Sequence, residues 1–480
     1  MSQTPKAPLP PELWDTLPKG VQELVLAMQA RIEQLEVQVQ ELEARLGQNS
    51  QNSSRPPSAD PPGFQRPRQD RGPSGRQRGG QPGHPGRHRI QYPEAQVDEV
   101  VELHPSQCDH CGAALGGMAA EEKEWRHQVV ELPEVRPRVT EYRLHSCRCP
   151  GCGKRAQPPW PDGVPRQGRG PRLQATAALL TGRYRLSRRE AQQLLGDLYQ
   201  VEFSLGSWSE LEGTTVQALT PVVAEVAQQV QQSGVVNLDE TGWREANRKG
   251  WLWTGVAPQV SLFRVEASRS GAVVEELLGE KFSGVAGTDR YGAYHRIPRP
   301  QRALCLAHVK RNFQALVDRG GEGARVGRWG LKELGWVFAL WHRFRDGFID
   351  RPGLQAGLRP IKARFAKLLE YGLWGEDHQA ETLCWQLKKH WDALWTFARV
   401  EGVEPTNNAA ERALRPAVLW RKGSFGTQSQ RGSRFAEEML TVAASCRQQG
   451  RNLLSFLVEA CKAALLGTSP PSLLPSPAPA

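Results

Sequence analysis

The amino-acid sequence predicts a multidomain α+β protein. Its 480 residues suggest roughly three or four domains. Apolar residues near the N-terminus recur at steps of three and four, as in a long helix, whereas strand-like and helix-like patterns follow one another after residue 233. The net charge of +11 and the isoelectric point of about 9.3 favour a polyanionic partner, nucleic acid before a membrane surface.

The N-terminal heptad pattern predicts a coiled coil over residues 21–47, after an arm of residues 1–20. The steps between its apolar residues alternate four and three, and these residues are Val21, Val25, Met28, Ile32, Leu35, Val39, Leu42 and Leu46. Mostly β-branched residues at a and Leu or Met at d favour a parallel homodimer, in which Arg31 can pair with Glu36 of a second copy. The alternative is one amphipathic helix packed on its own domain.

Residues 48–92 are expected to form a disordered tether, because Ser, Pro, Gly, Gln and Arg dominate there and almost nothing can be buried. Eight arginines stand against two aspartates between Ser53 and Tyr92. An arm of this kind suits sequence-independent contact with phosphates. The alternative is a merely soluble linker, which would more often mix both signs of charge.

Two Cys-x-x-Cys pairs predict a small zinc-ribbon-like domain over residues 93–165. Cys108 and Cys111 are followed, after 37 intervening residues, by Cys149 and Cys152, and part of the intervening sequence ("QVVELPEVRPRVTEYRLHS") reads as strands. Four thiolates suit one tetrahedral, structural Zn²⁺. Spare donors nearby are Cys147, His110 and His145.

Residues 166–232 read as a helical module. "SRRE" at 187–190 is a capping box that opens one helix, and after a break at 200–203 a second helix can start at Ser204. Short helix, turn and helix, with arginines at 183, 185, 188 and 189, fit a helix-turn-helix-like DNA-binding module. Plain helical packing fits the same pattern nearly as well.

From residue 233 the expected order is three strands, a helix, a strand, and a further strand with a helix, which is close to a ribonuclease-H-like α/β catalytic core (residues 233–320). Alternation places Asn237 and Asp239 on one face of the first strand and turns Glu240 to the other. We expect the first strand to end in Asp239 and the fourth in Asp289. Such folds hold two divalent metals between strand-end carboxylates and a later helix, and Mg²⁺ requires hard oxygen ligands.

A third acid must therefore come from a later helix. Glu411, within "TNNAAERALR" (406–415), follows in the right order. Helical periodicity places Asn407, Asn408 and Arg415 on the same face as Glu411. The alternative is an ordinary solvated helix on which Glu411 pairs with Arg415. Lesser candidates for the third ligand are Glu240 and Glu404.

Between Asp289 and Glu411 lie 121 residues, too many for the simplest core. Residues 321–403 show helical patterns and hold seven of the fifteen tryptophans, so an all-α insertion is expected, with these tryptophans in its core rather than on a base-stacking platform. Residues 404–466 then supply the C-terminal helices of the catalytic core, and the Pro/Ser-rich residues 467–480 a disordered tail.

The motifs "NLDETGWR", "GTDRYGAY", "CLAHVKRNF" and "NNAAERALRP…RKGSFG" resemble the characteristic blocks of the insertion sequence 66 family of bacterial transposases. The similarity extends to the heptad segment, the "NSSRPPS…GGQPGH" tether and the "CPGCG" knuckle. The family is one of DDE transposases, so the resemblance implies that Asp239, Asp289 and Glu411 are the catalytic, metal-binding residues. It also implies accessory proteins encoded by the same element.

The leading interpretation is an enzyme, a DDE transposase that cleaves transposon ends and joins the 3′-OH to target DNA, using two Mg²⁺ (or Mn²⁺) per active site and one structural Zn²⁺. The residues expected to contact DNA are Asn407, Asn408, Arg412, Arg415, Arg421, Lys422, His308 and Arg311. The alternatives are a catalytically inactive, element-derived DNA-binding protein and a nuclease without strand transfer. Because neither a signal peptide nor a membrane span is evident, we expect a bacterial cytoplasmic, nucleoid-associated protein without membrane contact.

Overall fold

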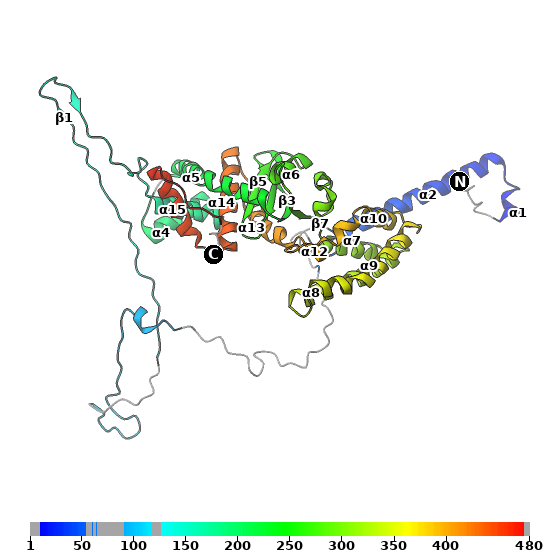
Figure 1. The fold of residues 1–480 in the computed structure, drawn as a ribbon, viewed down its shortest axis with the longest axis horizontal. Coiled ribbons are helices and arrows are strands. Elements are labelled where there is room, and N and C mark those ends of the chain that lie inside the picture. The colour runs from blue at the N-terminus through cyan, green and yellow to red at the C-terminus, as the bar shows by residue number, and fades with distance from the viewer. Residues whose placement is uncertain are drawn as a thin grey trace. The chain divides into compact units, whose positions relative to one another are not determined.

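The computed structural model describes residues 10–53, 60, 64, 91–116, 126–202 and 204–474. The other residues, which include most of the expected tether, the start of the expected arm and the end of the expected tail, lie outside the described residues. Figure 1 shows the order of the elements. The helices are α1 Pro11–Trp14, α2 Lys19–Leu46, α3 Pro171–Ala178, α4 Arg188–Tyr199, α5 Leu205–Gln232, α6 Gly271–Leu278, α7 Leu306–Arg319, α8 Gly323–Arg345, α9 Arg351–Leu373, α10 His378–Lys389, α11 Trp391–Leu394, α12 Thr396–Arg399, α13 Asn408–Ser424, α14 Gln430–Gln448 and α15 Leu453–Leu466. Within the described part, none of them is both long and apolar enough to cross a membrane.

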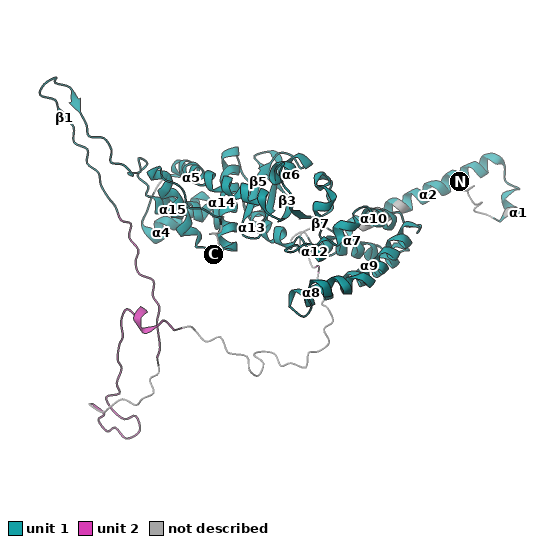
Figure 2. Ribbon diagram, viewed as in Figure 1, with its two compact units in different colours: residues 1–62, 139–480 teal, residues 63–138 magenta. Residues whose placement is uncertain are grey.

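The chain divides into two compact units, residues 63–138 and residues 1–62 with 139–480 (Figure 2). The expected zinc-binding domain, residues 93–165, is therefore not one compact unit. Its expected strands are also missing from residues 126–146, which pair with no other strand in the described part of the chain. Among residues 93–116 and 126–165, pairing is confined to the short strands β1 (Cys147–Arg148) and β2 (Arg155–Ala156) and to one bridge between Gln107 and Ala114. An alternating sequence alone does not make a sheet, because a strand needs a partner for its backbone groups.

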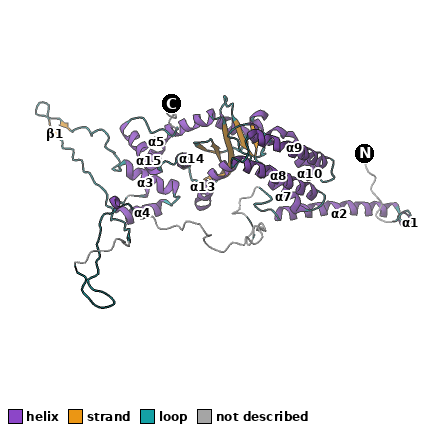
Figure 3. Cartoon of the chain, turned by 60° about the horizontal axis from the view of Figure 1, so that its bottom comes forward, coloured by secondary structure: helices purple, strands orange, loops and turns teal. Residues whose placement is uncertain are grey.

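The larger unit contains a mixed five-stranded sheet with helices on both of its faces (Figure 3). Its strands lie in the order β5-β4-β3-β6-β7. The first three pair antiparallel, and β6 and β7 continue in parallel from β3. They are β3 (Val235–Glu245), β4 (Arg248–Val256), β5 (Ser261–Glu266), β6 (Val285–Thr288) and β7 (Arg302–Leu304). The sequence predicted this order of strands and helices correctly.

The alternation of β3 separates two hydrophobic cores. Val236 and Leu238 are buried on the side of α5 and α6. Trp243, five residues beyond Leu238, is buried with the small residues of α13 on the opposite side of the sheet. Successive side chains of a strand point to opposite faces, so Asp239 shares the α13 side and Glu240 the α5 side.

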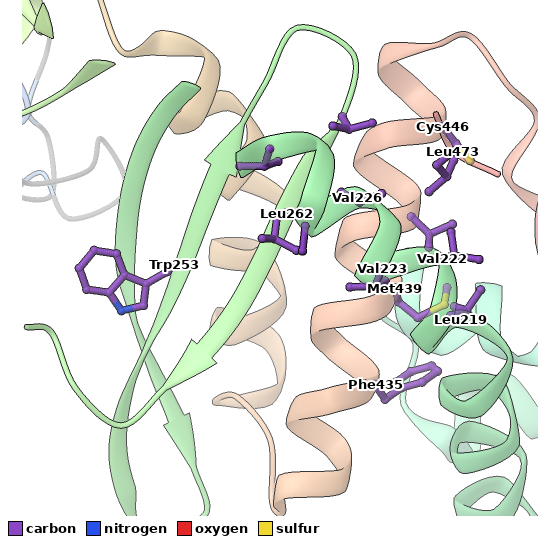
Figure 4. Packing of buried hydrophobic residues seen from close by; sticks show 14 of the residues in the cluster. Leu219, Val222, Val223, Val226, Trp253, Leu262, Phe435, Met439, Cys446 and Leu473 are labelled. Atoms are coloured by element: carbon purple, nitrogen blue, oxygen red, sulfur yellow. The ribbon is translucent and has the colours of Figure 1, made fainter. Parts of the chain in front are cut away.

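The larger core joins α5, α14 and the sheet (Figure 4). Leu219, Val222 and Val226 come from α5, whereas Phe435 and Met439 come from α14. The sequence placed residues 166–232 in a separate module, and this was wrong, because α3, α4 and α5 bury their apolar faces in the same core as the strands. A helix-turn-helix that uses α5 to read DNA also lacks support, since none of its 28 residues is Lys or Arg. The predicted capping box at Ser187 and Glu190 is confirmed.

Helix α14 covers the outer edge of β5 with hydrogen bonds from its side chains. Three alternate N–H groups of the strand donate to three side-chain oxygens at four-residue spacing on the helix. The pairs are Ser261 to Ser445 Oγ (3.0 Å), Phe263 to Thr441 Oγ1 (3.0 Å) and Val265 to Glu437 Oε1 (2.7 Å). The backbone groups of an edge strand, which have no neighbouring strand, are satisfied in this way.

The expected all-α insertion is present as α8 to α12, and its hydrophobic core is continuous with buried residues of β6, β7 and α7. Trp395 is buried there, and three further tryptophans pack against that core. Three others do not belong to it: Trp336, Trp374 and Trp385 expose 55%, 89% and 54% of their surface. The prediction that the tryptophans of the insertion are core residues was therefore wrong for these three. Trp336 and Trp385 lie on exposed faces of α8 and α10, and Trp374 directly follows the end of α9.

The two ends of the larger unit differ from the expectation of disorder. After α2, Asn52 is buried and its amide donates to the Asp318 carboxylate of α7 (2.8 Å). Near the C-terminus, Leu473 is fully buried in the α5–α14 core, and the Ser472 hydroxyl donates to Glu225 of α5 (2.7 Å). Residues 48–53 of the expected tether and 468–474 of the expected tail are therefore ordered.

Candidate active site and cysteine turns

The parallel pairing of β3 with β6 places two predicted acids side by side, Asp239 on β3 and Asp289 directly after β6. Asn237 pairs with Gly287, and two residues further along each chain stand Asp239 and Asp289. The Tyr291 N–H donates to Asp289 Oδ1 (2.8 Å), which orients that carboxylate just after β6 ends. Asp289 therefore lies where the sequence predicted, directly after the fourth strand.

Asp239 does not end its strand, contrary to the prediction. β3 continues to Glu245, because Glu240 and the residues after it pair antiparallel with β4 in a long hairpin. Asp239 marks instead the point at which β3 has left its parallel partner β6. The sequence therefore located the end of the parallel pairing between β3 and β6, and not the end of β3 itself.

The carboxyl group of Asp239 lies among other acids. Burial raises its pKa well above the ordinary value, and the negative charges of Glu240, Asp289 and Glu411 raise it further. The proximity of Glu411, which is separated from Asp239 by the whole insertion, places all three predicted carboxylates in one region. Two of these acids have a cationic partner, Glu240 in Arg269 and Glu411 in Arg311, whereas Asp239 and Asp289 form no ion pair within the described part of the chain. Buried or clustered carboxylates of this kind are typical of a functional site.

Asn407 fixes the start of α13 beside β3. Its side-chain amide donates to the Leu238 carbonyl (2.8 Å) and its backbone N–H to Cys305 Sγ (3.2 Å). Because Asn407 is 1% exposed, its predicted role as a DNA contact was wrong. Its hydrogen bond to the residue before Asp239 holds Glu411, one turn into α13, near the two aspartates.

Glu411 is not paired with Arg415. Its carboxylate instead accepts a hydrogen bond from Arg311 (3.3 Å) and lies 3.7 Å from His308 Nε2, and both of these residues belong to α7. The alternative interpretation of Glu411 as half of an exposed pair within one helix is therefore contradicted. Burial and the charge of Arg311 lower the pKa of His308, so its imidazole favours the neutral form.

The predicted DNA contacts on α13 fall into two groups, exposed residues and one residue that packs against the sheet. Arg412, Arg415 and Lys422 are exposed along α13, and Asn408 is partly exposed. Arg421 turns back to the sheet, where it donates to the Thr241 hydroxyl (3.1 Å) and to the Gly242 carbonyl. Arg421 thus ties α13 to β3, which leaves less of its guanidinium for a ligand.

A buried network behind Asp239 escaped the sequence analysis. The Glu240 carboxylate accepts hydrogen bonds from Arg269 and from the Tyr294 hydroxyl, and the Arg269 guanidinium stacks 3.7 Å from the centre of the Tyr291 ring. The signal was present in "DRYGAYHR", where two tyrosines at i and i+3 follow Asp289 directly. This network links the residue after Asp239 to the segment that follows Asp289.

The three carboxylates offer the hard oxygen ligands that Mg²⁺ prefers. Two observations fit a cation: the raised pKa of Asp239, and His308 Nδ1, which is buried without a hydrogen-bond partner in the described part. No group of three or more His, Cys, Asp or Glu side chains is close enough to hold a metal among the described residues. Glu411 would have to turn from Arg311 toward the aspartates to complete such a group.

The two cysteine pairs form the same local turn. In each, the first cysteine accepts from the glycine four residues later (2.8 Å in both), and that glycine, Gly112 or Gly153, has a positive φ. Backbone N–H groups within each turn point at the first thiol and lower the pKa of Cys108 and of Cys149. This geometry favours thiolates, the form that binds zinc. Because the two turns belong to different units, a single site for both remains a prediction.

The chain thus combines a mixed α/β core, which has acids at two adjacent strands, with two Cys-x-x-Cys turns of the same geometry earlier in the sequence. A model of the Transposase IS66 family matches residues 170–435, and a model of the zinc-finger binding domain of transposase IS66 matches residues 105–153. A family of unknown function, DUF6444, matches residues 5–90. Since the first match covers more than half of the chain, this protein belongs to the Transposase IS66 family.

Two relatives come from Sinorhizobium fredii. The chain is 26% identical over 391 residues to the uncharacterised protein y4hP. This match covers 73% of this chain and 69% of y4hP. It is also 26% identical over 307 residues to the uncharacterised protein y4qI, and this match covers 57% of this chain and 55% of y4qI. Neither name states an activity, so the family alone implies DNA binding.

Proposed function

We propose that the protein is a DNA transposase that cleaves transposon ends and joins the 3′-OH to target DNA by a two-metal DDE mechanism. The observation that carries the proposal is the gathering of Asp239, Asp289 and Glu411 from β3, the end of β6 and α13. The strand order β5-β4-β3-β6-β7, antiparallel and then parallel, supports a ribonuclease-H-like core. Family membership supports the same conclusion independently.

In this proposal the three carboxylates hold two Mg²⁺ or Mn²⁺ ions. When bound, such ions stabilise the attacking and leaving oxygens of a phosphoryl displacement. The protein supplies position: the Tyr291 N–H orients Asp289, and the Asn407 amide holds α13 against β3. Arg311 now neutralises Glu411, and the same guanidinium is free to contact a phosphate once that carboxylate turns to the aspartates.

The exposed cations Arg412, Arg415 and Lys422 stand on the same helix as Glu411. They suit phosphates of DNA that enters the site, since such contacts fix the position of the duplex. The cysteine turns are proposed to hold one structural zinc ion with Cys108, Cys111, Cys149 and Cys152 as ligands. Transposon ends and target DNA are the proposed substrates.

The direct test is an assay with purified protein and labelled duplexes from both flanks of its gene. We expect nicking at the 3′ ends of the element and joining of those ends to a plasmid, both dependent on Mg²⁺ or Mn²⁺. Cleavage without joined product would indicate a nuclease. Binding without either reaction would indicate the catalytically inactive, element-derived alternative.

We further propose that α2 forms a parallel coiled coil with a second copy. Seven of its eight heptad apolar side chains are exposed, from 40% at Val21 to 79% at Leu46. A packed helix would bury this stripe within its own domain, so its exposure supports an intermolecular partner. The heptad spacing specifies a helix of the same kind.

Charged residues in this stripe should therefore abolish the dimer. Burying one such side chain contributes roughly 1.5–3 kcal/mol, and a buried carboxylate reverses that gain. We expect Ile32→Asp with Leu35→Asp to halve the mass measured by light scattering, or to give a weaker assembly if other parts of the chain also associate. Ala27→Asp with Gln34→Asp, at outer positions of the same helix, should leave the mass unchanged. Equal masses for both pairs across a dilution series would rule out the coiled coil.

A further inference from the structure

One face of α8 carries a row of exposed residues, four of them cations, that the proposed active site does not use. The row advances by three or four residues at each step, so its members share one side of the helix. It consists of Arg325, Arg328, Lys332, Trp336, Ala339 and Arg343. All six are exposed, and Trp336 exposes 55% of its surface.

The charge of this face is not balanced. The one acid of α8, Glu333, is buried, lies off this row and pairs with Arg364 of α9 (3.0 Å). Arg328, Lys332 and Arg343 have no ion pair within the described part of the chain. A solvated helix face ordinarily mixes both signs of charge, so four cations without an acid indicate an anionic partner.

The row is held on a rigid support. Gly330 lies against the Phe313 ring of α7 so closely that an added Cβ would stand 2.5 Å from it. Gly327 approaches the α7 backbone in the same way, 2.6 Å from the Phe313 carbonyl oxygen. Together with the Glu333–Arg364 pair, this packing fixes the rotation of α8 about its axis. The cations therefore face outward without a rearrangement of the helix.

The dimensions match a nucleic-acid duplex. Arg325 and Arg343 are 18 positions apart, which is roughly 27 Å along a helix. That length spans about eight base pairs of DNA, whose strands carry a phosphate about every 3.4 Å along the axis. An exposed aromatic side chain between cations can pack on a deoxyribose while its neighbours contact phosphates.

We propose that the outer face of α8 binds the phosphate backbone of duplex DNA, outside the three-carboxylate site. The inference rests on the proposed function, since it assigns part of the DNA surface of that transposase to the all-α insertion. Arg328, Lys332 and Arg343 contact phosphates, and Trp336 packs against the sugar between them. Contacts of this kind are independent of base sequence.

The test uses the full-length protein and a 30-base-pair duplex of unrelated sequence, with affinity measured across a series of salt concentrations. Each phosphate contact contributes about 0.9 to the slope of log affinity against log salt. Removing three cations by R328Q/K332Q/R343Q should therefore lower the magnitude of that slope by roughly two to three. Trp336→Ala should weaken binding with the slope unchanged, because it removes no charge.

A matched control removes three exposed cations from other helices of the same insertion, R359Q/K367Q/K388Q. It should leave the slope near the parental value. A parental slope in the α8 triple variant, or an equal loss in the control, would overturn the proposal. The midpoint of thermal unfolding checks that each variant is folded. If the parental protein does not bind duplex DNA at all, the proposed function is overturned as well. If it binds and the α8 triple variant keeps the parental slope, this inference alone fails.

Discussion

Replacing Glu411 with Gln should abolish both cleavage and joining while binding of the transposon ends survives. The substitution keeps the shape of the side chain and removes the charge that would hold a cation. Both steps require the same ions, so both should fall together by several orders of magnitude. Asp239→Asn and Asp289→Asn should give similar losses, and the double variants little more, because ligands of one site act as a unit.

The measurements are end cleavage and strand transfer in Mg²⁺, with DNA affinity and thermal unfolding alongside. Asp239→Asn should not lower the unfolding midpoint, because it removes a charge that burial and three neighbouring acids disfavour. Glu401→Gln, at an exposed turn before α13, serves as the control and should retain full activity. A Glu411→Gln protein that joins ends at close to the parental rate would remove Glu411 from the active site.

Replacing Cys149 with Ser should release the zinc ion and unfold the cysteine segment. A structural zinc ion supplies folding free energy directly, on the order of 10 kcal/mol in small zinc domains. Loss of one thiolate of four removes most of it. We expect elemental analysis to give one zinc per parental chain and close to none for the variant.

Cys147→Ser is the matched control, because Cys147 is exposed, lies two residues before Cys149 and stands outside both turns. Its zinc content should equal the parental value. The opposite result, with zinc lost from Cys147→Ser and retained in Cys149→Ser, would show that the ligand set is wrong. A parental protein without zinc, purified without chelator, would contradict the site altogether.

Local pattern was sufficient to predict most elements of the larger unit. The alternation around Val236 and Leu238, the capping box at Ser187 and the strand before Asp289 each depend on neighbours within a few residues. The length of β3 could not be predicted in the same way. Its continuation past Asp239 depends on pairing with β4, whose register the sequence does not specify.

The contacts of Glu411 and Asn407 could not be predicted from helical periodicity. Glu411 and Arg415 are spaced for a pair within α13, yet Arg311 takes that carboxylate from a helix 100 residues earlier. Asn407 appeared to share the face of Glu411, but it stands one residue before the helix and turns to Leu238. Helical spacing predicts neighbours on one helix and cannot indicate which tertiary partner competes for them.

Exposure in the insertion was equally difficult to predict. Trp336 opens the apolar run "WVFALW" (336–341), which reads as core. The packing of α8 against α7 through Gly327 and Gly330 determines which side of the helix faces out. The opposite error occurred at Leu473, where a Pro/Ser-rich sequence suggested a free tail although one leucine fills a gap in the core. Composition describes a segment on average, whereas burial depends on single side chains.

The cover that α14 provides for β5 determines how copies of this protein can meet. An open strand edge is a template for a strand from another molecule, and association of that kind propagates without a fixed end point. Here Ser445, Thr441 and Glu437 already satisfy the alternate N–H groups of that edge, so a foreign strand would have to displace a whole helix. Strand addition at this edge is thereby hindered, so the proposed association of copies would depend on α2 and not on β5.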